Sequence, residues 1–240
     1  MKIIADLHTH TIASGHAYST LKENIEEGIV KGLLAIGTSD HAPKMPGAPQ
    51  LIFFENFKVI PNKIQNIHIL KGVEANILDY KGSIDITPEV MGKMDYIIAS
   101  LHTPCIAGGT MDENTQALIG AMNNPYVKVI GHPDDDRYPL DYDKLTRAAS
   151  KMKVALELNN SSLLPLSTRL NGRINAEKML KKCIENETMV IVGSDSHYCS
   201  DVGNFKEAIA LIEKIQFPER LIVNTSMEKL AYVLNSPKFI

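Results

Sequence analysis

The chain has 240 residues, of which 44% are hydrophobic and 22% charged. These values are typical of a soluble globular protein, and the length suits one large α/β domain spanning residues 1–240. The 25 basic and 28 acidic residues give a formal charge of −3, which excludes a broadly basic nucleic-acid binder. No apolar run reaches the roughly 20 residues of a membrane span, and the start turns polar too soon for a signal peptide. We therefore expect a cytoplasmic protein with neither a membrane nor a nucleic acid as partner.

Short apolar runs alternate with amphipathic stretches throughout, which is the pattern of a parallel sheet or barrel. Several runs, such as 33–36 and 189–192, are almost continuously hydrophobic, as strands covered on both faces are. Thr20 and Glu23 predict a capping box that opens a helix, which Gly32 would end. In chain order, the expected strands are 2–8, 33–40, 68–76, 96–102, 127–132, 154–159, 189–195 and 220–224, and the expected helices are 20–31, 141–153, 175–187 and 204–215.

Eight strand–helix units fit an α/β barrel, in which the loops after the carboxyl ends of the strands build the active site. A doubly wound open sheet would also satisfy the pattern, but its usual glycine-rich phosphate loop is missing from the sequence. We therefore prefer a TIM-like barrel.

Side chains that commonly bind metals lie at the ends of six expected strands or just after them. A barrel brings those ends to one point, so we expect the side chains to converge. Residues i and i+2 of a strand share a face, so His8 and His10 could reach one ion together. Imidazole and carboxylate are ligands for Zn²⁺, Mn²⁺ or Fe²⁺. The candidates are His8, His10, His16, Asp40, His41, Glu74, His102, His132, Asp195 and His197.

A single histidine at a strand end is more often structural than a metal ligand. Seven of the eight histidines, however, lie at or just after expected strand ends, and chance seldom produces such a coincidence. His68 is the exception. It lies six residues before Glu74, or about 20 Å away along the same strand. That places His68 at the opposite end of the barrel, and we assign it no catalytic role.

These motifs together resemble the polymerase and histidinol phosphatase (PHP) family, and within it the YcdX-type phosphatases. The resemblance runs nearly end to end and implies a distorted (β/α)7 barrel, so one of the eight expected strands would not complete the ring. It also suggests a homotrimer. The motifs are Asp6-Leu-His-Thr-His10, Ser39-Asp-His41, Glu74, Ser100-Leu-His102, Gly-His132-Pro and Gly-Ser-Asp195-Ser-His197, with Glu157 to Ser162 matching the same branch.

The resemblance implies three divalent ions, with zinc favoured and manganese or iron as alternatives. The implied groups are His8, His10, Glu74 and Asp195 for the first ion, a bridging Glu74 with His102 and His132 for the second, and His16, His41 and His197 for the third. The acidic run 134–136 departs from the family pattern and is interpreted as a solvated loop at the rim of the site.

Three divalent ions and two carboxylate ligands would leave a charge of about +4, which favours an anionic substrate. Bound metals can lower the pKa of water from 15.7 to about 7. We therefore predict a hydrolase, a phosphatase that cleaves small phosphate monoesters with a metal-bound hydroxide. Glu74 and Asp195 would hold the ions, and Asp40 would orient a ligand or transfer a proton.

Further roles are less specific. Asp6 could orient an imidazole, and Asn159, Asn160 and Ser161 could contact the substrate. Arg137, Arg169 and Arg173 could each bind a phosphate. Histidinol phosphatase and a phosphodiesterase or nuclease are alternative activities of the same family, and a non-catalytic metal-binding domain is an alternative of another class.

Overall fold

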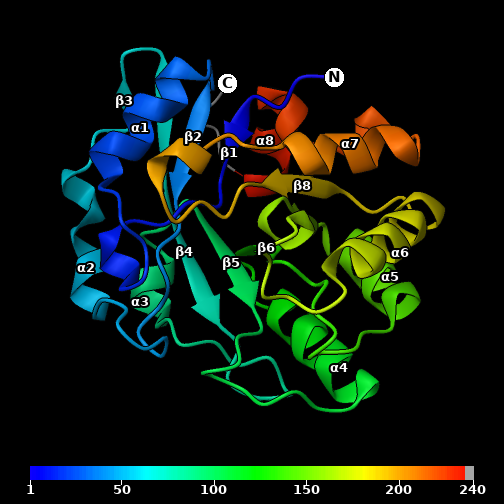
Figure 1. Ribbon diagram of the computed structural model, residues 1–240. Helices are drawn as coiled ribbons and strands as arrows, with labels where there is room; N and C mark the ends of the chain where they lie inside the picture. Colours follow the sequence, from blue (N-terminus) through cyan, green and yellow to red (C-terminus); the bar gives the residue numbers. More distant parts are fainter. Residues whose placement is uncertain (236–240) are drawn as a thin grey trace.

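Seven parallel strands form a nearly closed barrel with helices packed outside it (Figure 1), so the predicted α/β barrel is confirmed. The computed structural model describes residues 1–235. The strands follow the order β1-β2-β4-β5-β6-β7-β8 around the ring, and the short β3 pairs antiparallel with β4 outside it. Their bounds are β1 Ala5–Asp6, β2 Ala35–Thr38, β3 Lys63–Ile64, β4 Ile67–Asn76, β5 Tyr96–Ser100, β6 Val127–Ile130, β7 Ala155–Asn159 and β8 Val190–Gly193.

The helices lie on the outside of the ring, with α4 to α7 along one side of the view in Figure 1 and α1 and α2 on the other. Among the described residues, no helix combines the length and apolarity that a membrane span requires. The bounds of the helices are α1 Leu21–Val30, α2 Leu51–Glu55, α3 Pro88–Met91, α4 Met111–Met122, α5 Tyr142–Met152, α6 Gly172–Glu185, α7 Lys206–Lys214 and α8 Met227–Leu234.

The four predicted helices are confirmed, with α6 beginning at Gly172 rather than at residue 175. The capping box of α1 is present, because Thr20 Oγ1 accepts from the Glu23 N–H and the Glu23 carboxylate accepts from the Thr20 N–H. Four helices were not predicted, including α4, which has the same kind of capping box.

The eighth predicted strand, 220–224, is wrong. Two 3-10 turns, Glu219–Leu221 and Val223–Thr225, occupy this segment, and a single bridge joins Ile222 to Val190 of β8. The run is apolar because Leu221, Ile222 and Val223 are buried, and a buried turn gives the same sequence pattern as a short strand.

Asn224 joins β1 to β8 in place of a continuous ladder. Its amide nitrogen donates to the carbonyl oxygens of Ala5 (2.8 Å) and Val192 (2.7 Å), and its amide oxygen accepts from the Val192 N–H. Nearer the carboxyl ends, the chain pairs directly again through a bridge between Thr9 and Ser196. The β1–β8 junction is therefore closed by side chains and isolated backbone contacts rather than by a continuous ladder.

Tyr96 of β5 packs in a buried cluster with side chains of the other ring strands, such as Leu7 and Leu70. The side chain is buried, and its hydroxyl donates to the carbonyl oxygen of Leu7 across the barrel over 2.5 Å. A Cβ atom at Gly37 of β2 or at Gly72 of β4 would overlap the tyrosine ring or hydroxyl. The absence of a side chain at Gly37 and Gly72 therefore leaves the space that the Tyr96 side chain occupies.

Candidate metal centre

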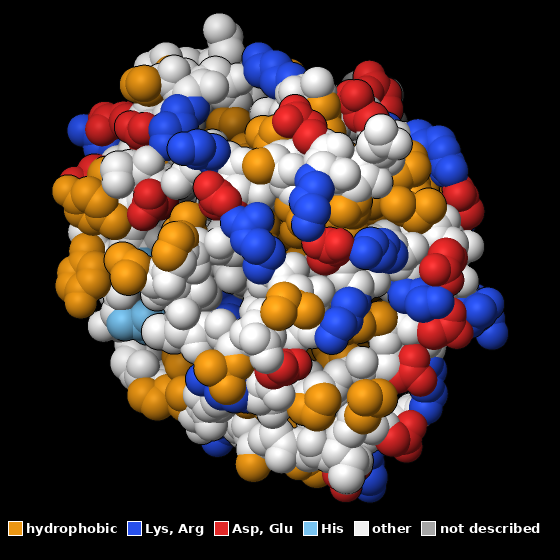
Figure 2. Space-filling view, turned by 45° about the vertical axis from the view of Figure 1, so that its right-hand side comes forward, with side chains coloured by type: hydrophobic (Ala, Val, Ile, Leu, Met, Phe, Trp, Pro, Cys, Tyr) orange, Lys and Arg blue, Asp and Glu red, His pale blue; other side chains and the backbone are white. Residues whose placement is uncertain are grey.

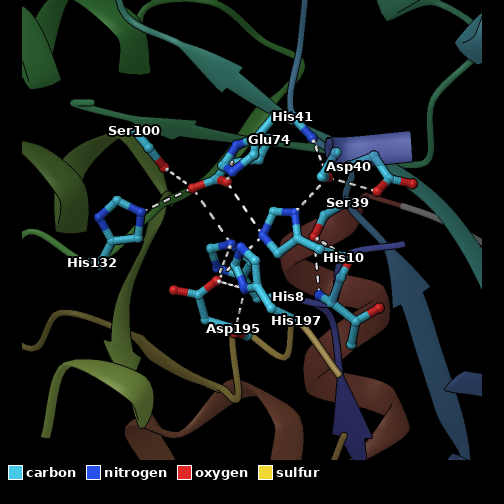
Figure 3. A network of polar contacts seen from close by, with 12 residues as sticks. His8, His10, Ser39, Asp40, His41, Glu74, Ser100, His132, Asp195 and His197 are labelled. Carbon is cyan, nitrogen blue, oxygen red and sulfur yellow. Dashed lines mark hydrogen bonds and ion pairs between the residues drawn. The ribbon is translucent and has the colours of Figure 1, made fainter. Parts of the chain in front are cut away.

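The predicted ligands gather at the carboxyl ends of the ring strands, around the carboxylate of Glu74 (Figure 3). Glu74 is fully buried near the end of β4, and its Oε1 accepts from the Ser100 hydroxyl at 2.7 Å. Five imidazoles surround the two carboxylate oxygens. Their nitrogens lie at 2.7 Å (His41), 2.9 Å (His132), 3.2 Å (His102), 3.4 Å (His8) and 3.5 Å (His10).

Asp195 is the second carboxylate of the cluster. Its Oδ1 lies 3.3 Å from His10 Nε2, 3.6 Å from His8 Nε2 and 3.5 Å from His197 Nδ1. The backbone at Asp195 has a φ of +55° and that at His132 a φ of +28°. Both ligands thus lie just after a strand in a conformation that L-residues seldom adopt, which the surrounding contacts must stabilise.

His16 completes the outer side of the cluster. Its ring centroid lies 5.0 Å from that of His41 and 4.8 Å from that of His197. All seven candidate histidines are therefore neighbours. His68 lies at the other end of β4, where it pairs in register with Ala35, as predicted.

The cluster fits divalent cations. Several of its nitrogen and oxygen atoms are buried and make no hydrogen bond of acceptable geometry, namely His8 Nε2, His10 Nε2, His41 Nδ1 and Glu74 Oε2. A buried polar atom without a hydrogen bond costs about 1–3 kcal/mol, so a group of four is the arrangement expected of atoms that bind cations. Three groups offer ligand atoms within 4.8 Å of one another: His8, His10 and Glu74; His10, His41 and His197; and His41, Glu74 and His102.

Most of the clustered histidines form a hydrogen bond at Nδ1, which fixes the ring and leaves Nε2 for an ion. Each of five Nδ1 atoms lies within 3.0 Å of an oxygen that can accept its proton. The pairs are His8 with Glu157, His10 with the Ser14 hydroxyl, His16 with the Ser14 carbonyl, His102 with Asn76, and His197 with the Asp195 carbonyl.

Asp40 is linked to the predicted ligand His10 through the hydroxyl of Ser14. Its carboxylate accepts from the Thr11 N–H, the Thr11 hydroxyl and the Ser14 hydroxyl, all within 2.8 Å. Because Ser14 donates its proton to Asp40, its oxygen is free to accept from His10 Nδ1. The predicted influence of Asp40 on a ligand would thus pass through Ser14.

The prediction that Asp6 orients an imidazole is wrong. Asp6 accepts from three backbone N–H groups, those of His8, Ser194 and Gly203, and so stabilises the chain on both sides of the β1–β8 junction. Glu157, to which we assigned no role, contacts the His8 imidazole instead at 2.7 Å.

Charge is strongly coupled within the cluster. Burial favours the neutral form of Glu74, but His102, His8 and His41 outweigh it and hold the pKa of that carboxyl well below its usual range. Burial also opposes protonation of His8, yet Glu157, Glu74 and Asp195 raise its pKa well above the ordinary value. Burial and neighbouring histidines lower the pKa of His10. The Glu74 carboxyl is therefore ionised within the cluster.

The three candidate arginines differ in position. Arg169 and Arg137 line the cleft above the cluster, whereas Arg173 pairs with Glu207 of α7 outside it. Of the residues at the end of β7 and just after it, Ser161 lines the cleft, but Asn159 and Asn160 are buried. The Asn160 side chain accepts from two N–H groups at the start of α7.

The acidic run 134–136 is not a solvated loop, so that interpretation is wrong. Asp134 and Asp135 are buried. Asp134 accepts from the Ser162 hydroxyl, Asp135 accepts from the N–H of Leu170 and pairs with Arg137, and the exposed Asp136 accepts from Asn171 and Asn175. The run therefore holds segment 162–175, which carries Arg169, beside the histidine cluster.

The cleft has a volume of about 570 Å³. Besides the ligands and two arginines, its lining includes apolar side chains of Met45, Pro46, Leu101, Pro104 and Leu166. Histidine atoms reach the surface at the left of Figure 2, between hydrophobic side chains. Two larger hollows, of about 890 and 640 Å³, are lined by none of the clustered histidines.

Residues 6–161 match the family model of the PHP domain. The chain belongs to the PHP family. It is 42% identical over 236 residues to a probable phosphatase of Clostridium novyi, covering 98% of this chain and 96% of the relative. It is 45% identical over 243 residues to a probable phosphatase of Caldanaerobacter subterraneus, covering 99% and 93%.

Among solved structures, a histidinol phosphate phosphatase from Lactococcus lactis, complexed with zinc, L-histidinol and phosphate, has a similar fold. The TM-score is 0.60 at 19% identity, covering 90% of this chain and 95% of that chain. Together these relatives place the chain among PHP phosphatases by sequence, and among PHP barrels by fold.

Proposed function

We propose that this PHP protein is a metal-dependent phosphatase that hydrolyses small phosphate monoesters at a centre of three divalent ions. The observation that carries the proposal is the convergence of seven histidines and two carboxylates, several with buried atoms that lack a partner, at the floor of an open cleft. The naming of relatives as probable phosphatases along nearly the whole chain supports the activity.

The residues that would hold the ions are those that the family resemblance implies, with Glu74 between two of them. Bound divalent ions would supply positive charge to the phosphoryl oxygens and acidify an attacking water molecule. Imidazole and carboxylate ligands suit zinc, and the fold relative from Lactococcus lactis was solved with zinc and phosphate. Zinc is therefore the metal that we would test first.

Side chains that do not bind the ions would also contribute to phosphate binding and catalysis. Arg169 lies within the cleft with its guanidinium hydrogen-bonded to Asp195 and Ser162, so it adds fixed positive charge beside the cluster. Fixed donors of this kind stabilise charge that develops in a transition state. Asp40, through Ser14, keeps the proton of His10 on Nδ1. The apolar wall of the cleft would face the leaving group.

The test is metal content by plasma mass spectrometry together with turnover of p-nitrophenyl phosphate, with and without a chelator. Wild type should hold about three ions per chain and lose turnover on chelation. His10→Ala should lose both metal and turnover. His68→Ala is the matched control, since it removes a histidine from the far end of β4 and should change neither.

Further substrates separate the alternatives. Turnover of bis(p-nitrophenyl) phosphate in preference to the monoester would favour a phosphodiesterase, and strong preference for L-histidinol phosphate would favour histidinol phosphatase. A full complement of metal without turnover of any phosphoester would overturn the proposal in favour of a non-catalytic metal-binding domain.

A further inference from the structure

β7 is the ring strand that contributes none of the predicted ligands, yet its side chains lie directly behind the metal centre. Glu157 is at the middle of β7 and is 1% exposed. Its Oε1 lies 2.7 Å from His8 Nδ1. Its Oε2 accepts from the backbone N–H of His132 at 2.8 Å and from the Asn159 side chain at 3.1 Å. One carboxylate thus contacts two ligand residues from different parts of the ring.

The geometry of the ring makes this reach possible. β8 lies between β7 and β1, so the Glu157 side chain must pass β8 to meet His8. It does so at Gly193, where an added Cβ would overlap Glu157 Oε1 and would lie 3.0 Å from His8 Cβ. The missing side chain at this position therefore leaves the space in which the contact forms.

We propose that Glu157 is a positioning residue that sets two metal ligands at once. Through Oε1 it holds the His8 proton on Nδ1, so that Nε2 is free for an ion. Through Oε2 it stabilises the backbone of His132, which has the unfavourable φ of +28°. The inference rests on the proposed metal centre and adds a residue outside its ligand set.

An amide cannot take the place of this carboxylate. All three groups that face Glu157 are donors: the His8 Nδ1–H, the His132 N–H and the Asn159 amide. A glutamine has one accepting oxygen and an NH₂ group that only donates. Its NH₂ must face either His132 and Asn159 or the His8 ring. In the second case His8 would accept at Nδ1 and carry its proton on Nε2, the nitrogen that the ion needs.

The experiment compares Glu157→Gln with wild type by zinc titration and by the visible absorption of the Co²⁺-substituted protein. We expect zinc affinity to fall by about 10–100-fold, as is usual when an outer partner of a ligand is lost, and the Co²⁺ spectrum to change. Glu187→Gln is the matched control, because Glu187 is an exposed glutamate paired with Arg220 far from the cluster. It should behave as wild type.

Thermal unfolding in the presence of a chelator separates positioning from a purely structural role. A positioning residue changes zinc affinity and the Co²⁺ spectrum even when the chelated protein unfolds near the wild-type temperature. Wild-type affinity and an unchanged spectrum in Glu157→Gln would overturn the inference. If wild type binds no zinc, the proposed function itself fails. If wild type binds zinc and Glu157→Gln binds it equally well, only the inference about Glu157 fails.

A second measurement needs no variant, should Glu157→Gln not fold. In ¹⁵N-histidine NMR spectra of the zinc-loaded wild type, the His8 ring should carry its proton on Nδ1 and bind zinc through Nε2. A His8 ring that binds zinc through Nδ1, or that binds none, would contradict the proposal.

Discussion

Arg169 Nη2 donates to Oδ2 of Asp195 over 2.8 Å, while Oδ1 of the same carboxylate faces the histidines of the cluster. Asp195 thus divides its oxygens between the ligands and the arginine. Burial would favour a neutral Asp195, but His8 and Arg169 hold the pKa of that carboxyl well below its ordinary value. The arginine therefore helps to keep a predicted metal ligand ionised and oriented.

Arg169→Met should reduce kcat/KM for p-nitrophenyl phosphate by roughly 10²-fold or more, because it removes fixed positive charge and leaves Oδ2 of Asp195 with the Asn159 amide as its remaining donor. Arg169→Lys should restore little, since an ammonium lacks the planar fork that contacts both Asp195 and Ser162. Steady-state kinetics at saturating zinc measures this. Arg173→Met is the control, and equal losses in both variants would contradict the assigned role.

Gly72→Ala should destabilise the barrel, because its Cβ would overlap the buried ring of Tyr96. Overpacking of this kind typically costs about 1–3 kcal/mol. Urea unfolding of the chelated protein gives the value. Gly92→Ala, whose added Cβ would have only ordinary contacts, should change little. In a Tyr96→Leu background the cost of Gly72→Ala should shrink, and an unchanged cost there would rule out the overlap as its cause.

Asp134 should make stability depend on pH. Burial raises the pKa of this carboxyl to about 7, whereas an unfolded chain has about 3.9. Between these values the folded state binds more protons, so the free energy of unfolding should fall as the pH rises from about 4 to about 7. Asp134→Asn removes this loss. The variant should therefore exceed wild type in stability at pH 8 by a few kcal/mol, at ~1.4 kcal/mol per pKa unit, and gain nothing at pH 4.

Asp136→Asn provides a control of opposite sign for the same measurement. Hydrogen bonds from Asn171 and Asn175 lower the pKa of Asp136, so its charge is stabilising above pH 4. The variant should lose stability at pH 8. Urea unfolding in chelator at both pH values tests the pair, and a stability difference for Asp134→Asn that is the same at pH 4 and pH 8 would refute the assignment.

The convergence of the candidate ligands was predictable because they lie at or just after the ends of hydrophobic runs, and such runs are readily recognised in an α/β sequence. Imidazoles at the ends of five hydrophobic runs, or just after them, had to converge once the runs were taken as a barrel. Glu74 was found in the same way. A separation of six residues along one strand also placed His68 correctly at the end of β4 opposite Glu74.

Asp40 and Arg169 were named from the sequence, but the contacts of Glu157 and Asp134 were not predictable, because they depend on neighbours distant in sequence. Glu157 is 149 residues from His8, and only the ring order and the glycine at 193 show that the two meet. The burial of Asp134 follows from segment 162–175 folding over it, which no local pattern indicates. By contrast, α4 was missed despite a local signal, since Thr110 and Glu113 repeat the capping box of α1.

The contact of Asn224 with Ala5 closes the barrel between segments that lie near the two ends of the described chain. Ala5 and Asn224 are 219 residues apart, and contacts of such separation form late in folding because the intervening loop must close first. We therefore expect β1, and with it His8 and His10, to be ordered only after residue 224 is available. During synthesis on the ribosome, the nascent protein would then gain its metal-binding capacity in one late step. Hydrogen-exchange labelling of the His10 amide, which donates to Ser196, would show whether its protection appears last.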